Sequence, residues 1–552
     1  LLLLSLNPLI DNENKQNEDN MGLLHLDRSK LSLKNSNDWS ASGSAANPAV
    51  LRSVDTSPSN EIVVSGVISG STTMTLGSKS ITSGQYIEPW IAKADANGNW
   101  QWIQKVSITG TSQYAEATVQ DISVAPNGDI FATGMFYDTI SFGSITLTST
   151  GYWDCWTAKL SPSGQWQWAQ ALRGNGDYDG VTVTTLDVVY GTSITTDSNS
   201  NPVVGGWFLG NTDVGVAADT GAQDGTDIEV FVAKYGNSGN LQWTEVARGQ
   251  GSQEINTMTV DTNNDIWVAT TFEVSMTFGS VVANAGINEI PMGIARISQS
   301  GTWQSAYATT GSGQPLATDF TMDDQNNLLM SGFYTGSINL GSQLTSSGQN
   351  DAFIASMNPS GSWNWAQSVG GSSYDAGSGV EYDSNTGYAI LGLYSQSSFN
   401  FGSQTFNTRG FNDSVVVTFT SSGNPVALFD AGSSLDDAIT GISLMPNGAL
   451  VVAGNYNGTI DFGSSSAASQ STSVLIPYVW VTETIAVLDA DGDGVADDDD
   501  NCPNTANPGQ ENTDQDSEGD ACDSVVDNDG IPDNFPDHCP RNSQTGWTST
   551  RD

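Results

Sequence analysis

A unit of about 65 residues recurs along this chain, and it constrains the fold more than any other sequence feature. The stretch DISVAPNGDIFATG, residues 121–134, returns as ISLMPNGALVVAG at 442–454 and as MTVDTNNDIWVAT at 258–270. A Leu-Gly or Phe-Gly pair and then a Ser follow in every copy except the third. Aligned on the last residue of the stretch, the copies end at Gly66, Gly134, Gly206, Thr270, Gly332, Gly392 and Gly454.

Apolar residues alternate with polar ones inside each copy, and turns such as Pro-Asn-Gly separate the runs, which is typical of β-hairpins. The second copy predicts four strands, at Thr118–Ala125, Asp129–Phe136, Trp153–Leu160 and Gln165–Leu172. A single four-stranded sheet leaves both faces uncovered, whereas sheets packed side by side in a ring cover them. The repeat therefore predicts an all-β fold, a seven-bladed β-propeller of four-stranded antiparallel blades over residues 37–488.

The two ends of the array predict how the ring closes. The last copy runs through VWVTETIAV, residues 479–487, and lacks its own fourth strand. Before the first copy, NDWSASGS at 37–44 resembles the fourth strand of the other copies. We expect the strand around Trp39 to complete the last blade, because that blade would otherwise expose an unpaired edge.

Most copies end on a glycine turn followed by Trp, as in Gly164–Trp168 and Gly361–Trp365. With its Asn-Gly turn and the glycine of the following strand, the unit resembles the SBBP-type β-propeller repeat of bacterial and archaeal surface proteins. The ending is also similar to the docking repeat of PQQ-dependent alcohol dehydrogenases, but this chain has seven units and no vicinal cysteine pair. We expect each Trp to fix one blade to the next.

Charge and histidine content exclude several classes of function. Acidic residues outnumber basic ones by 61 to 16, for a net charge of −45, so we expect neither nucleic-acid binding nor docking on an anionic membrane. The chain contains two histidines, His25 and His538, and both lie outside the repeats. A Ser-His-Asp triad or a His-rich zinc site in the repeats is therefore excluded.

Carboxylate pairs leave one enzymatic alternative open, because two acids about 5–10 Å apart are enough to hydrolyse a glycoside. The candidates are Asp177 with Asp179 and Asp436 with Asp437, which follow Gly/Ser-rich stretches where acids usually form turns. Cys155 occupies a position where a later copy has Ala352, which indicates a buried, inert thiol. We therefore expect a protein that is not an enzyme.

The N-terminal run LLLLSLNPLI is too short to span a bilayer and is typical of the end of a signal-peptide hydrophobic region. We interpret residues 1–20 as the remnant of a signal peptide and a disordered lead-in, and expect no membrane insertion. Secretion would allow the cysteines that follow the repeats to pair.

Residues 489–523 carry alternate carboxylates and a glycine in the order of the first half of an EF-hand loop. Calcium takes six to eight oxygen ligands, and short Asp side chains at every second position can surround one ion. The expected ligands of the first ion are Asp489, Asp491, Asp493 and Asp500, the carbonyl of Val495, and Asp497 directly or through water. Further ions are expected at Asp514, Asp516, Asp520 and Asp523.

The same stretch resembles the thrombospondin type 3 repeat, including Asn501-Cys502-Pro503 and the closing Asp520–Asp523. The resemblance implies calcium binding, an extracellular setting and a disulfide between Cys502 and Cys522. A second, partial unit contains Asp527 and Asp529, but has Val525 where the first Asp should be. We assign residues 489–540 to calcium-dependent, irregular repeats and 541–552 to a truncated linker.

Together these observations predict a secreted or cell-surface calcium-binding protein. The propeller would be a recognition or adhesion module for an unknown extracellular protein or glycan, and the calcium-stiffened tail would be a stalk. The alternatives are an extracellular propeller enzyme that acts on polysaccharides and a purely structural surface or matrix component.

Overall fold

The chain divides into two compact units, residues 1–36 and 37–552, and every residue described below belongs to the second. The computed structural model describes residues 39–44, 49–150, 152–174, 187–214, 219–220, 228–249, 251–286, 290–457, 459–461, 466–468, 476–483, 501–502, 505–513 and 519–523.

Short antiparallel strands make up the repeats, and four of them form a sheet in each copy. In the second copy these are β9 (Glu116–Val124), β10 (Ile130–Tyr137), β13 (Asp154–Leu160) and β14 (Trp166–Gly174), in the order β9-β10-β13-β14. The expected apolar alternation is approximate in the outer strands, where buried and partly exposed residues are mixed, and is absent from the middle strands. Every residue of β13 is buried, as is nearly every residue of β10, because neighbouring sheets cover both faces of the middle strands.

The same four-stranded order recurs along the chain. It is formed by β2 (Ala49–Thr56), β3 (Ile62–Ile68), β6 (Glu88–Ala94) and β7 (Trp100–Lys105); β15 (Val188–Thr196), β16 (Pro202–Leu209), β19 (Glu229–Tyr235) and β20 (Leu241–Gly249); β21 (Glu254–Val260), β22 (Ile266–Thr271), β25 (Met292–Ile297) and β26 (Trp303–Ala308); β27 (Gln314–Met322), β28 (Leu328–Thr335), β31 (Asp351–Met357) and β32 (Trp363–Val369); and β33 (Asp375–Asp383), β34 (Tyr388–Ser395), β37 (Asp413–Phe419) and β38 (Pro425–Ala431).

A small hairpin between the second and third strands adds to the four strands that the sequence predicted for each copy. The hairpins are β4 (Thr73–Leu76) with β5 (Lys79–Thr82), β11 (Thr139–Phe142) with β12 (Ile145–Thr148), β17 (Asn211–Asp213) with β18 (Asp219–Thr220), β23 (Ser275–Phe278) with β24 (Val281–Asn284), β29 (Ser337–Asn339) with β30 (Gln343–Thr345), β35 (Phe399–Phe401) with β36 (Gln404–Phe406), and β41 (Thr459–Asp461) with β42 (Ser466–Ala468). β8 (Ser107–Ile108) pairs with β11. The Phe-Gly marker forms the hairpin turn, where Gly143 and Gly279 have positive φ.

The fourth strand in the sheet of the last copy comes from the beginning of the repeats. β39 (Asp437–Leu444), β40 (Ala449–Tyr456) and β43 (Ile476–Glu483) follow one another, and β1 (Trp39–Ser44) lies antiparallel beside β43. Trp39 is opposite Val481 and Ser42 is opposite Tyr478 in this register. The sequence around Trp39 therefore supplies an outer strand to the last copy.

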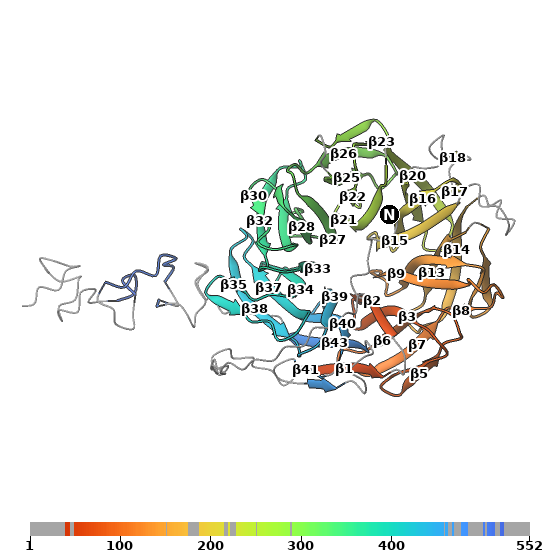
Figure 1. Cartoon of the computed structure of the whole chain (residues 1–552), viewed down its shortest axis with the longest axis horizontal. Coiled ribbons are helices and arrows are strands. Elements are labelled where there is room, and N and C mark those ends of the chain that lie inside the picture. Colours follow the sequence, from red (N-terminus) through yellow and green to blue (C-terminus); the bar gives the residue numbers. More distant parts are fainter. Residues whose placement is uncertain are drawn as a thin grey trace, which may run out of the picture. The chain divides into compact units, whose positions relative to one another are not determined.

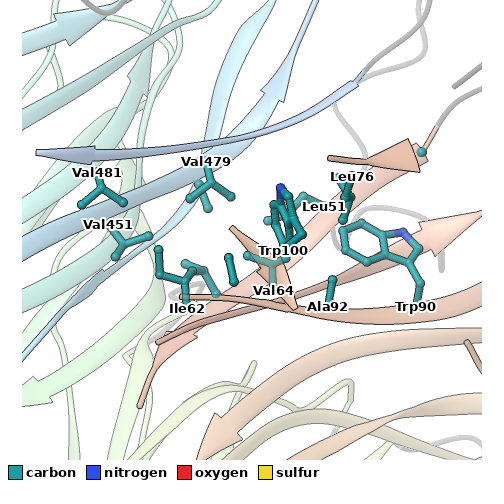
Figure 2. Packing of buried hydrophobic residues seen from close by; sticks show 14 of the residues in the cluster. Leu51, Ile62, Val64, Leu76, Trp90, Ala92, Trp100, Val451, Val479 and Val481 are labelled. Carbon is teal, nitrogen blue, oxygen red and sulfur yellow. The ribbon is translucent and has the colours of Figure 1, made fainter. Parts of the chain in front are cut away.

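Successive sheets lie side by side through their first strands. β2 contacts β9, the contacts continue through β15, β21, β27, β33 and β39, and β39 contacts β2. Figure 1 shows these strands innermost around a common centre. Figure 2 shows the packing where the first and last copies meet: Val451, Val479 and Val481 lie in one buried cluster with Leu51 and Trp90.

In the sixth copy, the structure shifts by one residue the position that the sequence alignment had placed at Gly392. A β-bulge in each first strand marks the equivalent position, as where Val119 pairs with Gly134. In the sixth copy the corresponding pair is Gly377 with Leu393, so Leu393 and not Gly392 is the equivalent residue. The glycine there suggested the wrong register because the copy carries its glycine one position early.

Tryptophans of the fourth strands connect neighbouring sheets in four copies, as the sequence predicted, but in the fourth copy Trp303 packs on Phe278 of its own copy and Tyr307 makes the contact instead. The indole N–H of Trp168 donates to the carbonyl of Asn237, and a Cβ on Gly239 would lie 2.8 Å from the Trp168 ring. Only glycine fits there, and its φ of 87° also favours glycine. Equivalent contacts join Trp102 to Gly164, Trp243 to Gly301, Tyr307 to Gly361 and Trp365 to Gly423.

Candidate functional site

The described part of the tail is organised around a disulfide bond between Cys502 and Cys522, which confirms the predicted pair. Asn501 holds both arms of the loop: its N–H donates to Gln510 Oε1, and its carbonyl accepts from the N–H of Gly519. The side-chain oxygen of Asn501 accepts a further bond from Asn507 Nδ2. These amides, together with the disulfide, fix a tail segment that contains almost no apolar residues.

Asp520 is the predicted calcium ligand whose carboxylate contacts are clearest. Its two oxygens accept hydrogen bonds from the N–H and the hydroxyl of Thr513, each at 2.7 Å. Asp523, also described, donates its backbone N–H to Gly519. The other predicted ligands lie outside the described residues: Asp489, Asp491, Asp493, Val495, Asp497, Asp500, Asp514, Asp516, Asp527 and Asp529.

A recurrent buried acid begins the third strand in five copies, and the sequence reading missed it. Asp154 accepts the N–H groups of Thr150 and Gly174, so it holds the loop that enters the strand and the end of the fourth strand. The equivalent residues are Glu88, Glu229, Asp351 and Asp413. A sequence signal was present. In the second copy the aligned residue Gly134 pairs with Trp156, and the acid, Asp154, comes two residues before that Trp. These acids are part of the fold's hydrogen bonding.

The two carboxylate pairs weighed for glycoside chemistry have different outcomes. Asp177 and Asp179 lie outside the described residues. Asp437 is the first residue of β39 and is fully buried, rather than a turn former, and burial raises its pKa to about 7. Asp436 accepts a hydrogen bond from the Asn412 amide. Cys155 is buried without a disulfide, as expected, and burial raises the pKa of its thiol to about 12.

Four carboxylates project from the first strands and bind backbone N–H groups of neighbouring sheets. Asp55 accepts from Val124 N at 2.6 Å, Asp121 from Ile194 N at 2.9 Å, and Asp319 from Val380 N at 2.9 Å. Glu381 accepts from Leu444 N at 3.3 Å. Each acid thereby joins two copies that are adjacent in the chain.

These central carboxylates resist ionisation. Burial raises the pKa of Asp55 to about 6 and that of Asp319 to about 7. Burial, followed by the charges of Asp319 and Asp55, raises the pKa of Glu381 well above its usual value. The pKa of Asp121 is also raised, again mainly by burial. None of the described ion pairs includes any of the four.

A cavity of about 660 Å³ opens where the first strands end, and residues from all seven copies line it. This volume is in the range of small-ligand sites. Glu381, Tyr382 and Asp383 line one side, with Met322 from the preceding copy. Pro58, Pro126 and Pro446 come from turns that follow first strands. Sequence reasoning could not have found this cavity, because its lining residues are separated by whole copies.

Basic residues on the third strands distinguish the first four copies from the last three. Lys93 pairs with Glu61, Lys159 with Asp129, Lys234 with Asp197, and Arg296 with both Asp261 and Asp265. The positions equivalent to these bases are Ser356, Thr418 and Val481 in the last three copies. The first four copies therefore neutralise their turn acids, and the fifth and sixth retain Asp323 and Asp383 without such a base.

The comparison with protein families identifies the tail. The family model of the thrombospondin type 3 repeat matches residues 488–510 and 511–546. Repeats of this type typically bind calcium, and the predicted ligands fall within the matched residues. The described residues contain no helix long and apolar enough to cross a membrane.

Similarities of the remaining chain are more distant. An uncharacterized WD repeat-containing protein of Acanthamoeba polyphaga mimivirus is 29% identical over 214 residues, which is 35% of this chain but only 14% of that protein. Quinohemoprotein alcohol dehydrogenase from Comamonas testosteroni matches with a TM-score of 0.37 and 10% identity, over 84% of this chain and 78% of that one.

Virginiamycin B lyase from Staphylococcus aureus, in a catalytically inactive form with quinupristin, also has a TM-score of 0.37 and 10% identity, over 80% of this chain and 98% of that one. Such scores carry no argument about activity, and the strand order described above defines the architecture. The chain therefore combines an all-β, propeller-like domain of four-stranded antiparallel sheets with C-terminal thrombospondin type 3 repeats that contain a disulfide bond.

Proposed function

We propose that this is a secreted or cell-surface calcium-binding protein, in which a closed seven-bladed propeller of SBBP type is a recognition or adhesion module and the tail is a calcium-stiffened stalk. The thrombospondin type 3 match with its disulfide carries the proposal, because such bonds persist mainly in oxidising compartments outside the cytosol. The partner would be an extracellular protein or glycan.

The propeller's role as a binding module, not an enzyme, is supported by the use that its buried acids already have. Glu88, Asp154 and Asp351 hold loop N–H groups, and Asp55 and Asp319 hold neighbouring sheets. These bonds give each of the five carboxylates a structural role, which agrees with a binding module. The cavity where the first strands end gives the module a place to bind a ligand.

The proposal is tested by calorimetry with calcium on the full chain and by array screening on immobilised glycans and extracellular proteins, with and without calcium. We expect several calcium ions to bind and the chain to be retained by one class of partner. Absence of calcium binding would contradict the proposal, and turnover of a polysaccharide would establish the enzymatic alternative instead.

A further inference from the structure

The cavity at the ends of the first strands has a neutralised side and an acidic side. On the third and fourth copies, Lys234 lies 2.9 Å from Asp197 and Arg296 lies 2.8 Å from Asp261, and both acids line the cavity. On the sixth copy, Asp383 occupies the position equivalent to Asp197 and, like it, accepts hydrogen bonds within its own turn, from Asn385 N and Thr386 Oγ1, but Thr418 replaces the lysine. The repeat thus keeps the acid and omits its base on one side of the cavity.

Glu381 adds a second carboxyl group to this acidic side. It lines the cavity, its Oε1 takes one long hydrogen bond from Leu444 N, and it belongs to none of the described ion pairs. Tyr382 lies between Glu381 and Asp383 in the sequence and lines the same side. Because side chains alternate along a strand, Glu381 and Asp383 share one face of β33, and two carboxyl groups on one face favour a cation.

A metal ion fits these residues less well than an organic cation. Among the residues that the structure describes, no three acids, histidines or cysteines lie near enough to one another to hold a metal. The cavity is also large for one ion, and Pro58, Pro126, Pro446 and Met322 give it an apolar wall. An alkyl chain that ends in a charge would cover that wall and bring its cation to the carboxyl groups.

We propose that this cavity binds a lysine or arginine side chain of a protein partner, with its ammonium or guanidinium group between Glu381 and Asp383. The proposal rests on the recognition role proposed above and names the chemistry of the partner. The raised pKa of Glu381 agrees with the proposal. Burial and the negative charges of Asp319 and Asp55 disfavour the ionised form of Glu381, and a bound cation would offset that effect.

The test is a titration of the full chain with three capped peptides, in which the NMR signals of the peptide report binding. The peptides are acetyl-Gly-Arg-Gly-amide, acetyl-Gly-Lys-Gly-amide and acetyl-Gly-Gln-Gly-amide. Saturating calcium and about 0.15 M salt limit contacts with exposed charges of the tail. We expect at least one cationic peptide to bind about tenfold more tightly than the glutamine peptide. Equal binding of all three, or none, would overturn the proposal.

Two variants locate the binding. Glu381→Gln retains an acceptor for Leu444 N and removes the charge, and Thr418→Lys introduces the base that Lys234 provides in the third copy, next to Asp383. We expect each to weaken the cationic peptide at least fivefold. Glu245→Gln on β20, a partly exposed acid that does not line the cavity, controls for net charge and should change binding less than twofold.

The outcomes separate this inference from the proposed function. If Thr418→Lys lowers the melting temperature strongly, Glu381→Gln alone decides, because it preserves the hydrogen bond. Unchanged peptide affinity in a folded Glu381→Gln variant would overturn the assignment of the cavity, even if calcium still binds the tail. If the chain bound the cationic peptide but no calcium, the proposed calcium-stiffened stalk would be contradicted, and the assignment of the cavity would be unaffected.

Discussion

Trp168 and Gly239 show how single residues fix one sheet to the next. The glycine is needed for two reasons, a positive φ of 87° and the ring of Trp168 within 2.8 Å of a Cβ. Gly402 also has positive φ, 57°, but a Cβ there would meet only Pro425 at 3.5 Å. The two positions separate the effect of backbone conformation from the effect of the tryptophan contact.

We predict that Gly239→Ala destabilises the propeller by about 2–4 kcal/mol, because a strained backbone and overpacking each contribute about 1–3 kcal/mol. Gly402→Ala is the matched control and should lose only the backbone part, about 1–2 kcal/mol. Denaturant unfolding followed by tryptophan fluorescence measures both. An equal decrease in the free energy of unfolding in the two variants would show that the contact with the Trp168 ring does not stabilise the fold.

The central carboxylates predict a pH dependence of stability. Their pKa values are raised in the folded chain, so the stabilisation is complete below the unfolded values near 4 and is lost as the pH rises through the folded values, about 6 for Asp55 and about 7 for Asp319. Lowered pKa values of Asp95 and Asp197 act in the opposite direction at lower pH.

We therefore expect the melting temperature of the propeller to fall between about pH 5 and pH 8 in saturating calcium. Glu381→Gln should melt higher than the natural chain at pH 8 and should show a weaker pH dependence, because one group that must ionise is gone. Differential scanning calorimetry at several pH values measures this. A variant curve parallel to that of the natural chain would contradict the role given to Glu381.

At the scale of elements, the repeat predicted the four main strands of the second copy to within two residues. Alternation and glycine turns define those strands locally. The small hairpins were missed because Phe142-Gly143 was treated as a marker and not as a turn. The register of the sixth copy was also missed, because a bulge adds a residue that Gly392 conceals. Hydrogen bonds between copies, such as Asp319 with Val380, have no local sequence signal.

The tail offers a different case, since its cysteine pair was implied by the resemblance to a family and has no local signal of strand or turn. Closing a loop of this size with a disulfide contributes about 3 kcal/mol. We expect ion coordination to supply the remaining order of the tail, because its aspartates repel one another and few apolar residues are available. Binding energy is then folding energy.

We predict that Asp491→Ala combined with Asp493→Ala removes at least one calcium ion, as calorimetry would measure. Chelation should speed proteolysis after Asp489 and leave the melting transition of the propeller nearly unchanged, because its buried clusters contain their own core. Unchanged stoichiometry in the double variant would contradict the ligand assignment. Loss of the propeller transition on chelation would contradict its independence from calcium.

At the scale of the whole molecule, one strand connects the beginning of the repeats to their end. β1 pairs with β43 from Trp39 to Ser42, and its continuation, Gly43 and Ser44, pairs with β4 of the first copy. Val479 and Val481 of β43 pack in the same cluster as Ile62 and Trp90. A ring closed in this way needs no capping strand at either end.

Deleting residues 1–45 removes β1 and leaves β43 as an unpaired edge beside the first copy. We predict a markedly lower melting temperature and more self-association, because an exposed edge strand offers free N–H and carbonyl groups to other chains. Deleting residues 1–36 is the matched control, since it removes the first compact unit and keeps β1, and it should melt like the full chain. Calorimetry and light scattering measure the two effects. Equal melting of both truncated chains would show that the ring is held without this strand, whereas a loss confined to the longer deletion places the closure in the pairing of β1 with β43.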